Sequence, residues 1–108
     1  QNQSIQHPLV ENWCSIEAAW LMTMKAAALY DRKEPCGSYA NAAKLLAGRA
    51  AFDAATQAVL THGGMGYAKE YQVERLFRES ILQRLTPITE QLILSFIAEK
   101  ELGMPKSY

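Results

Sequence analysis

Apolar residues recur at steps of three and four along the first part of the chain. They include Leu9, Trp13, Ile16, Trp20, Met24 and Ala27. This spacing gathers them on one face and predicts an amphipathic helix from about Ser4 to Asp31. Pro8 fits such a helix only near its start or at a kink. Pro35 and Gly37 then interrupt the pattern and indicate a turn.

A second apolar pattern, rich in alanine, predicts a helix that runs from Ser38 to about Thr61. Ser38 is a suitable N-cap because its hydroxyl can accept a bond from a free helix N–H. The many small side chains indicate that neighbours approach this helix closely on more than one side. His62 in the last turn and Gly63 directly after it are ordinary helix-ending residues.

The third predicted helix runs from about Glu70 to Arg84. It carries opposite charges four residues apart, Glu74–Arg78 and Arg75–Glu79, which stabilise a helix surface. Its expected buried side consists of Val73, Leu76, Phe77, Ile81 and Leu85.

A fourth helix is expected to follow, with Thr86 as its cap and Pro87 in its first position, where the missing N–H costs nothing. Gly103 and Pro105 stop it. No strand pattern, repeat or low-complexity run occurs. The predicted fold is therefore all-α, an antiparallel four-helix bundle with short connections.

Length and composition limit the possible functions. The 108 residues suffice for one domain, and 11 basic residues balance 11 acidic ones, which argues against nucleic acid or a membrane surface as partner. No apolar run is long enough to span a bilayer, and the polar start shows no signal-peptide pattern. Because the chain begins with Gln1 and not Met, we expect it to be a piece of a longer protein.

The cysteines and tryptophans suggest structural roles. Cys14 and Cys36 match no metal or redox spacing; a single disulfide is possible, but reduced thiols are expected. Cys14 lies on the apolar stripe and is predicted to be a small buried group. Trp13 and Trp20 are predicted to lie in the core or in a subunit interface. No metal site is predicted.

A glycine-rich segment lies between the second and third helices. It reads Gly63-Gly64-Met65-Gly66-Tyr67, followed by Glu70-Tyr71-x-Val73-Glu74-Arg75-Leu76-x-Arg78. This combination resembles the C-terminal helical domain of the acyl-CoA dehydrogenases, and the resemblance, which includes Gln3 and Ala43-Lys44, covers essentially the whole chain. Glycine lacks a Cβ, so its backbone can approach a diphosphate and donate N–H bonds to it.

The resemblance implies a flavoprotein that desaturates an acyl-CoA thioester between its α and β carbons. The cofactor would be FAD, and a flavin electron acceptor would take the electrons. By position, the family's cofactor contacts are Gln3, Gly63, Gly64, Thr89 and Gln91, with the glycine turn against the pyrophosphate of a flavin in a neighbouring subunit. A homo-oligomer such as a homotetramer, in the cytoplasm or in the mitochondrial matrix of a eukaryote, is expected.

The sequence departs from the family pattern at the catalytic base. Pro87 stands where family members often carry the glutamate that removes the α-proton and whose N–H holds the thioester oxygen. Proline supplies neither carboxylate nor N–H. Glu90 is the nearest carboxylate, and a charge that complements the helix start is its simpler interpretation. Leu60 occupies a position where some relatives carry a polar flavin contact.

Three functions remain open at this point. The first possibility is that the chain is the C-terminal domain of an active acyl-CoA dehydrogenase whose base lies upstream. Alternatively, it is a non-catalytic subunit of a heteromeric acyl-CoA dehydrogenase that keeps part of the flavin site. The third possibility is a helical assembly module without a cofactor, in which the glycines form a structural corner only.

Overall fold

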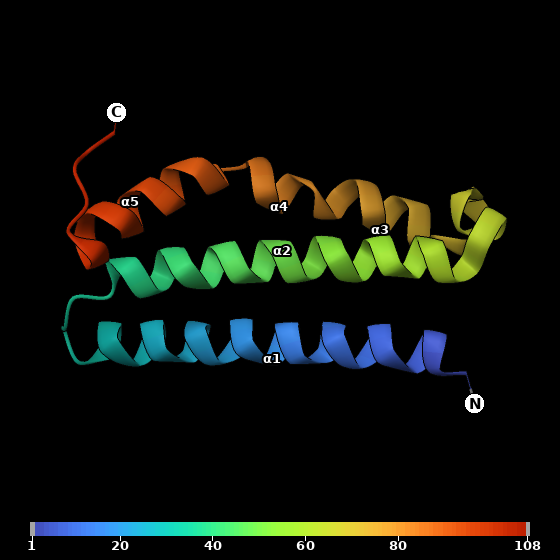
Figure 1. The fold of residues 1–108 in the computed structure, drawn as a ribbon, viewed down its shortest axis with the longest axis horizontal. Coiled ribbons are helices and arrows are strands. Elements are labelled where there is room, and N and C mark those ends of the chain that lie inside the picture. The colour runs from blue at the N-terminus through green and yellow to red at the C-terminus, as the bar shows by residue number, and fades with distance from the viewer. Residues whose placement is uncertain (1, 108) are drawn as a thin grey trace.

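The computed structural model describes residues 2–107 and shows helices arranged in three layers (Figure 1). The middle layer is α2, α1 lies along one side of it, and α3, α4 and α5 form a row along the other side. The α-helices are α1 (Gln3–Asp31), α2 (Gly37–His62), α3 (Val73–Ser80), α4 (Leu82–Leu85) and α5 (Glu90–Leu102). Two short 3-10 helices, η1 (Gly63–Tyr67) and η2 (Lys69–Tyr71), join α2 to α3.

The first two helices form an antiparallel hairpin close to the prediction. The side chain of Asn2 caps α1 by accepting a bond from the Ser4 N–H at 3.1 Å. Pro8 lies inside α1, in its second turn, where proline cannot donate the N–H bond that a helix interior uses. The predicted Ser38 cap is wrong because α2 begins at Gly37. The Ala40 N–H already bonds to the Cys36 carbonyl at 2.9 Å, so Ser38 lies inside the first turn.

The third predicted helix is shorter than expected and interrupted. Gln72 has a left-handed backbone conformation, with φ of 62°, which cannot continue a right-handed helix. The segment before it, including Glu70, therefore forms η2, and α3 starts at Val73. A second interruption at Ile81 separates α3 from α4, so Arg84 belongs to the short helix α4 and not to α3.

The predicted start of the last helix is also wrong. Thr86 is extended, the Thr86–Pro87 peptide bond is cis, and both residues lie in the connection before α5. Thr89 caps α5 instead, because its hydroxyl accepts a bond from the Leu92 N–H at 3.4 Å. Gly103, with φ of 63°, ends α5 as the sequence predicts.

The core within this chain is small. Its buried apolar residues are Ala19, Ala26, Ala43, Leu45, Ala50 and Ile93. The alanine side of α1 faces α2, whereas the predicted apolar stripe lies about a third of a turn away around the helix. Trp13 and Trp20 are therefore 62% and 58% exposed, which rules out a core position, and Cys14 is exposed where a buried thiol was predicted.

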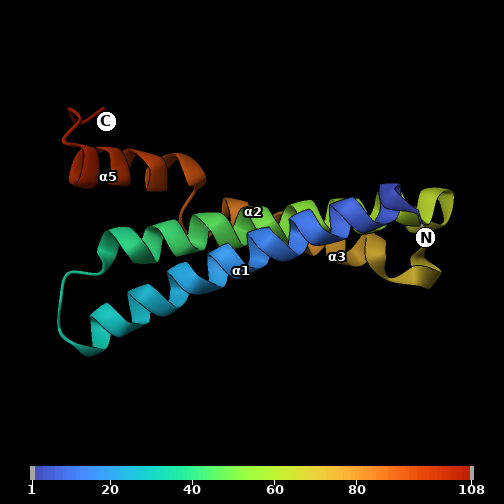
Figure 2. The ribbon, with the colours of Figure 1, turned by 60° about the horizontal axis from the view of Figure 1, so that its bottom comes forward.

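The shape differs from that of a closed bundle. The accessible surface is 7778 Å², whereas a compact monomer of 12.1 kDa exposes about 6000 Å². The radius of gyration is 16.6 Å, against about 13 Å for a compact chain of this length. Figure 2 shows α1 crossing α2 with α5 on the far side. The all-α prediction is confirmed. The four-helix count is not, because the third predicted helix is divided into α3 and α4 and the layers do not enclose a common core.

Two sequence predictions about surfaces can be compared with the helices of residues 2–107. Within this range no helix combines the length and the apolar character that crossing a bilayer requires. The predicted ion pairs of α3 are confirmed: Arg78 Nε lies 2.8 Å from Glu74 Oε2, and Arg75 Nη1 lies 3.1 Å from Glu79 Oε1.

Candidate functional site

The turn at the end of α2 contains three glycines, and each has a different structural setting. Gly63 ends α2 with φ of 59°, a conformation that side chains rarely adopt. Gly66 is buried, and a Cβ placed on it would lie 2.4 Å from the Val59 carbonyl oxygen. Gly63 and Gly66 are therefore required by the fold of the turn itself.

Gly64 is different because no described contact or backbone angle requires a glycine at this position. It is exposed, its φ lies outside the left-handed region, and among residues 2–107 no atom beyond the adjoining backbone comes within 4 Å of a Cβ built on it. An alanine would fit here as far as this chain is concerned. The open space over Gly64 is what the approach of a ligand to this backbone would need.

The residues around the turn hold it in place. His62 Nδ1 lies 2.8 Å from the Ala58 carbonyl, and its ring meets Tyr71 edge-on at 5.9 Å between centroids. The Arg78 hydrogen bond lowers the pKa of the Glu74 carboxyl. Leu60 is 68% exposed and offers an apolar surface beside the turn.

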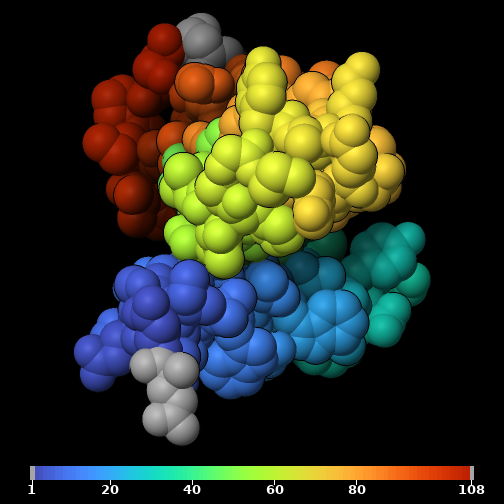
Figure 3. Space-filling view, turned by 90° about the vertical axis from the view of Figure 1, so that its right-hand side faces the viewer, coloured from blue at the N-terminus to red at the C-terminus, as the bar shows by residue number. Residues whose placement is uncertain are grey.

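Gln3 lies at the same end of the molecule as the glycine turn. It is the first residue of α1, which runs antiparallel to α2, and it is exposed. Figure 3 looks onto this end, with the blue start of α1 below the yellow-green turn. The structure thus places Gln3, Gly63 and Gly64 on one end face.

The other two predicted contacts lie elsewhere. Thr89 and Gln91 flank the first residue of α5 and line a cavity of about 270 Å³ between α4 and α5. Glu90 between them pairs with Arg49 of α2. Gly63, directly after the end of α2, lies 14 residues beyond Arg49, about 21 Å along the helix axis. The predicted contacts therefore form two groups, which only an elongated ligand could touch together.

Glu90 is held by two arginines. Its side chain accepts from Arg84 Nε at 2.6 Å and from Arg49 Nη2 at 3.1 Å, and the residue is 8% exposed. The hydrogen bond from Arg84 is the main cause that lowers the pKa of Glu90, and Arg49 adds to it. A base for proton abstraction must be free to take a proton near neutral pH. This carboxylate is paired on both oxygens, so the geometry suits a structural role.

Sequence reasoning missed this cluster. Arg49 and Glu90 are 41 positions apart, and no helix spacing connects them. Arg84 and Glu90 lie six residues apart, but the connection between α4 and α5 separates them. The available signal was an acidic residue at a helix start, which indicated a charge effect but not its partners.

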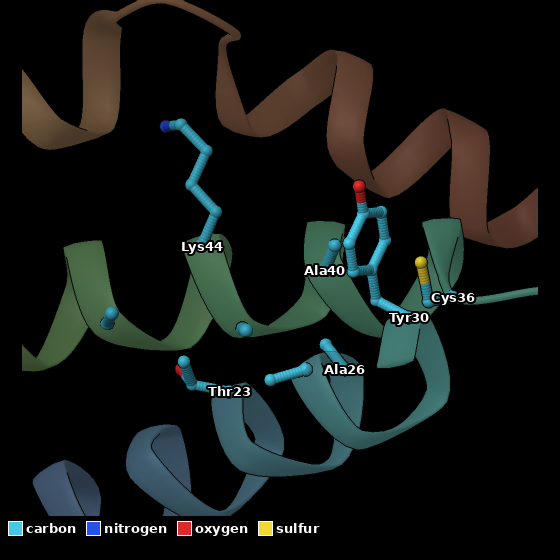
Figure 4. Close-up of a pocket in the computed structure, with 9 residues that line it drawn as sticks. Thr23, Ala26, Tyr30, Cys36, Ala40 and Lys44 are labelled. Carbon is cyan, nitrogen blue, oxygen red and sulfur yellow. The ribbon is translucent and has the colours of Figure 1, made fainter. Parts of the chain in front are cut away.

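An apolar groove lies between α1 and α2 near the connection of the hairpin, at the opposite end from Gln3 and the glycine turn. It has a volume of about 460 Å³ between α1 and α2. Figure 4 shows Thr23 and Ala26 of α1 opposite Ala40 of α2, with Tyr30 and Cys36 at the hairpin connection. Lys44, also in its lining, donates to the Gln83 carbonyl at 2.8 Å. Neither a carboxylate nor an imidazole lines this groove.

The thiols and other potential ligands show no metal arrangement. Both cysteines are free, Cys14 exposed and Cys36 half-buried. Across residues 2–107, no three His, Cys, Asp or Glu side chains come together as a metal site would require.

These elements form an all-α domain in which a glycine turn precedes a charged helix. The family model described as "Acyl-CoA dehydrogenase, C-terminal domain" matches residues 1–102. The chain belongs to this family.

Individual relatives agree with that assignment. The chain is 41% identical to acyl-CoA dehydrogenase FadE12 of Mycobacterium tuberculosis over 99% of its own length and 28% of that relative. It is 31% identical to the CarC subunit of the caffeyl-CoA reductase–Etf complex of Acetobacterium woodii, over 91% of the chain and 27% of CarC. The chain thus spans little more than a quarter of the curated relatives it matches.

A solved structure shares the fold. It is described as the electron transferring flavoprotein of Acidaminococcus fermentans and superposes with a TM-score of 0.87 at 28% identity. The superposition covers 92% of this chain and 26% of that chain. The same fold therefore occurs as part of a larger polypeptide.

Proposed function

We propose that residues 1–108 are the C-terminal helical domain of a longer acyl-CoA dehydrogenase. That enzyme would bind FAD and remove hydrogens from the α and β carbons of an acyl-CoA thioester. This chain would supply one wall of the flavin site and part of a subunit interface. Family membership and 41% identity to FadE12 support the proposal.

The observation that carries the flavin assignment is the open backbone at Gly64. Gly63 and Gly66 have structural reasons to be glycine, whereas the described part of the chain gives Gly64 none. A glycine beside open space is explained if a diphosphate approaches the turn and accepts main-chain N–H bonds. Gln3, on the same end face, is a polar neighbour for such a group.

The residues fit FAD in part. Gly64 and Gln3 would lie along the pyrophosphate, and Thr89 and Gln91 would face the adenosine half. Leu60 offers no hydrogen bond where a polar contact is expected. When bound, FAD accepts the hydride that leaves the β carbon of the substrate.

The catalytic base is proposed to lie outside residues 1–108. Pro87 has no carboxylate to remove a proton and no N–H to hold the thioester oxygen. Glu90, three residues on, is occupied by Arg49 and Arg84. Loss of one oxyanion donor typically costs about 100- to 1000-fold in rate, so another group must replace the amide missing at Pro87.

Assembly is the second part of the proposal. The chain exposes about 1800 Å² more than a compact monomer of its mass. A standard interface takes about 800 Å² from each partner. The exposed apolar face of α1 supports burial against other parts of a homo-oligomer. We place the assembly in the cytoplasm, or in the mitochondrial matrix of a eukaryote, where a flavin electron acceptor would reoxidise it.

Pro87 and one relative favour a second candidate. The chain would then be a non-catalytic subunit that shares a flavin site with a different chain. CarC is a subunit of a caffeyl-CoA reductase–Etf complex. A helical assembly module without cofactor is the third candidate, and it leaves the open backbone at Gly64 unexplained.

The test compares three samples by flavin absorbance after purification. These are the 108-residue chain, the longest natural polypeptide that contains it, and that polypeptide with Gly64→Ala. The long form should carry FAD, the 108-residue chain should bind it weakly or not at all, and Gly64→Ala should lower occupancy without loss of helix. Tight stoichiometric binding by the 108 residues alone would contradict the proposal. Flavin loading that requires a different chain would favour the second candidate, and no flavin in any sample would favour the third.

A further inference from the structure

At the start of α5, a buried carboxylate lies between the two residues that are predicted ligand contacts. Thr89 and Gln91 are the half-buried and exposed neighbours of Glu90, which is 8% exposed. Because Glu90 lies directly between them in the chain, its position fixes where their backbones can lie. What holds Glu90 therefore also places the two polar residues beside it.

Three helices meet on this one carboxylate. Arg49 of α2 donates from Nε at 3.2 Å and from Nη2 at 3.1 Å to Oε2. Arg84 of α4 donates from Nε to Oε1 at 2.6 Å and from Nη2 to Oε2 at 3.2 Å. The Arg84 guanidinium also lies 5.1 Å above the Phe52 ring, which limits its movement. We call Arg49, Arg84 and Glu90 the carboxylate clasp.

The other hydrogen bonds that the described residues form around this connection do not join α5 to α2. The Thr86 N–H bonds back to the Leu82 carbonyl within α4, and the Thr89 hydroxyl caps its own helix. Lys44 of α2 donates to the Gln83 carbonyl and so holds α4. The Arg49–Glu90 bonds are the corresponding link between α2 and the start of α5.

The clasp also forms part of a cavity wall. The cavity of about 270 Å³ between α4 and α5 is lined by Ile81, Arg84, Leu85, Thr89, Glu90 and Gln91. This lining contains one guanidinium group, that of Arg84, and one carboxylate, that of Glu90, and the two form an ion pair. The cavity therefore offers the Thr89 hydroxyl and the Gln91 amide beside this paired arginine, which suit a polar ligand.

We propose that Glu90 is a positioning residue that holds Thr89 and Gln91 toward the adenosine half of the flavin dinucleotide. This inference rests on the proposed function. Glu90 does not touch the ligand; it acts through its ion pairs with Arg49 and Arg84. Loosening the clasp weakens recognition of the adenosine half and leaves recognition of the flavin ring unchanged.

The experiment uses Glu90→Gln in the full-length flavoprotein and compares the dissociation constants of FAD and FMN. FMN carries the flavin ring and one phosphate but lacks the adenosine half. An amide keeps the size of the side chain but places an NH₂ group against guanidinium donors, so the clasp opens. The affinity for FAD should fall about tenfold, about 1.4 kcal/mol or one hydrogen bond, while that for FMN stays constant.

Glu79→Gln is the matched control. Glu79 also forms an ion pair with an arginine, Arg75 at 3.1 Å, but it lies in α3, away from the first turn of α5. It should leave the ratio of FAD to FMN affinity unchanged. If Glu90→Gln changes neither affinity, or lowers both equally, the positioning role is refuted while the proposed function stands. If the unmodified protein binds neither FAD nor FMN, the proposed function fails as well.

Discussion

Gly66→Ala should destabilise this chain much more than Gly64→Ala, although the two residues lie in the same turn. A Cβ on Gly66 would lie 2.4 Å from the Val59 carbonyl oxygen and 2.9 Å from its Cα. Ordinary contacts begin near 3.4 Å, so backbone atoms on both sides would have to separate by about 1 Å. Since protein interiors are close-packed, such overpacking costs about 3 kcal/mol.

The same reasoning predicts that Gly64→Ala slightly raises the free energy of unfolding. The methyl group enters open space and φ lies outside the left-handed region. Alanine restricts the unfolded chain more than glycine does, which stabilises the folded state by about 0.5 kcal/mol where the backbone permits it. The two substitutions therefore differ by about 3.5 kcal/mol within one 3-10 helix.

Thermal unfolding followed by circular dichroism measures this difference. For a domain of this size, about 1 kcal/mol shifts Tm by about 4 °C or more. Gly66→Ala should lower Tm by about 12 °C or more, and Gly64→Ala should leave it equal or slightly higher. Equal losses for both variants would refute the argument, because the close approach to Val59 would then not limit the turn.

Three further predictions follow from other features. Gly63→Ala places a side chain at φ of 59° and should cost about 1 kcal/mol by chemical denaturation; no loss would mean that the turn relaxes. The folded-state pKa of Glu90 is lowered, so its stabilisation is present above the unfolded pKa and is lost as pH falls through the folded value. Glu90→Gln should therefore cost about 1.5 kcal/mol near neutral pH and remove part of the acid dependence seen in pH-resolved denaturation, whereas an unchanged profile would contradict the pairing. Trp13→Ser with Trp20→Ser should reduce self-association in sedimentation experiments, while a chain that is monomeric before substitution would contradict the interface assignment.

Local patterns predicted the helices and the surface ion pairs. The spacing in the first segment located α1 to within a residue, and the charges of α3 formed both expected pairs. These features depend on neighbours within one or two turns, which a single sequence contains. The family signature predicted the fold for a different reason, because the glycine turn and the charged helix together are specific.

The sequence alone could not decide which of two possible capping residues begins the last helix. Thr86 and Thr89 are both good caps, and the sequence favours Thr86 because proline follows it. The structure uses Thr89, where the helix start also brings Glu90 to Arg49 and Arg84. That gain comes from residues of other helices, so helix patterns cannot reveal it.

Burial was predicted least well. Periodicity showed that Trp13 and Trp20 share a face, and it does not say whether this chain covers that face. The side that packs on α2 is the alanine side, where backbones approach closely. A sequence shows which side of a helix is apolar, whereas packing partners decide which side is buried.

The small core has a thermodynamic consequence. Ile93 is the only fully buried large side chain among the described residues, and most large apolar groups are already in water before unfolding. The denaturant m-value and the heat-capacity change scale with the surface that unfolding exposes. Both quantities should be low for a chain of 108 residues and should rise with protein concentration if copies associate, because unfolding would then expose the interface as well.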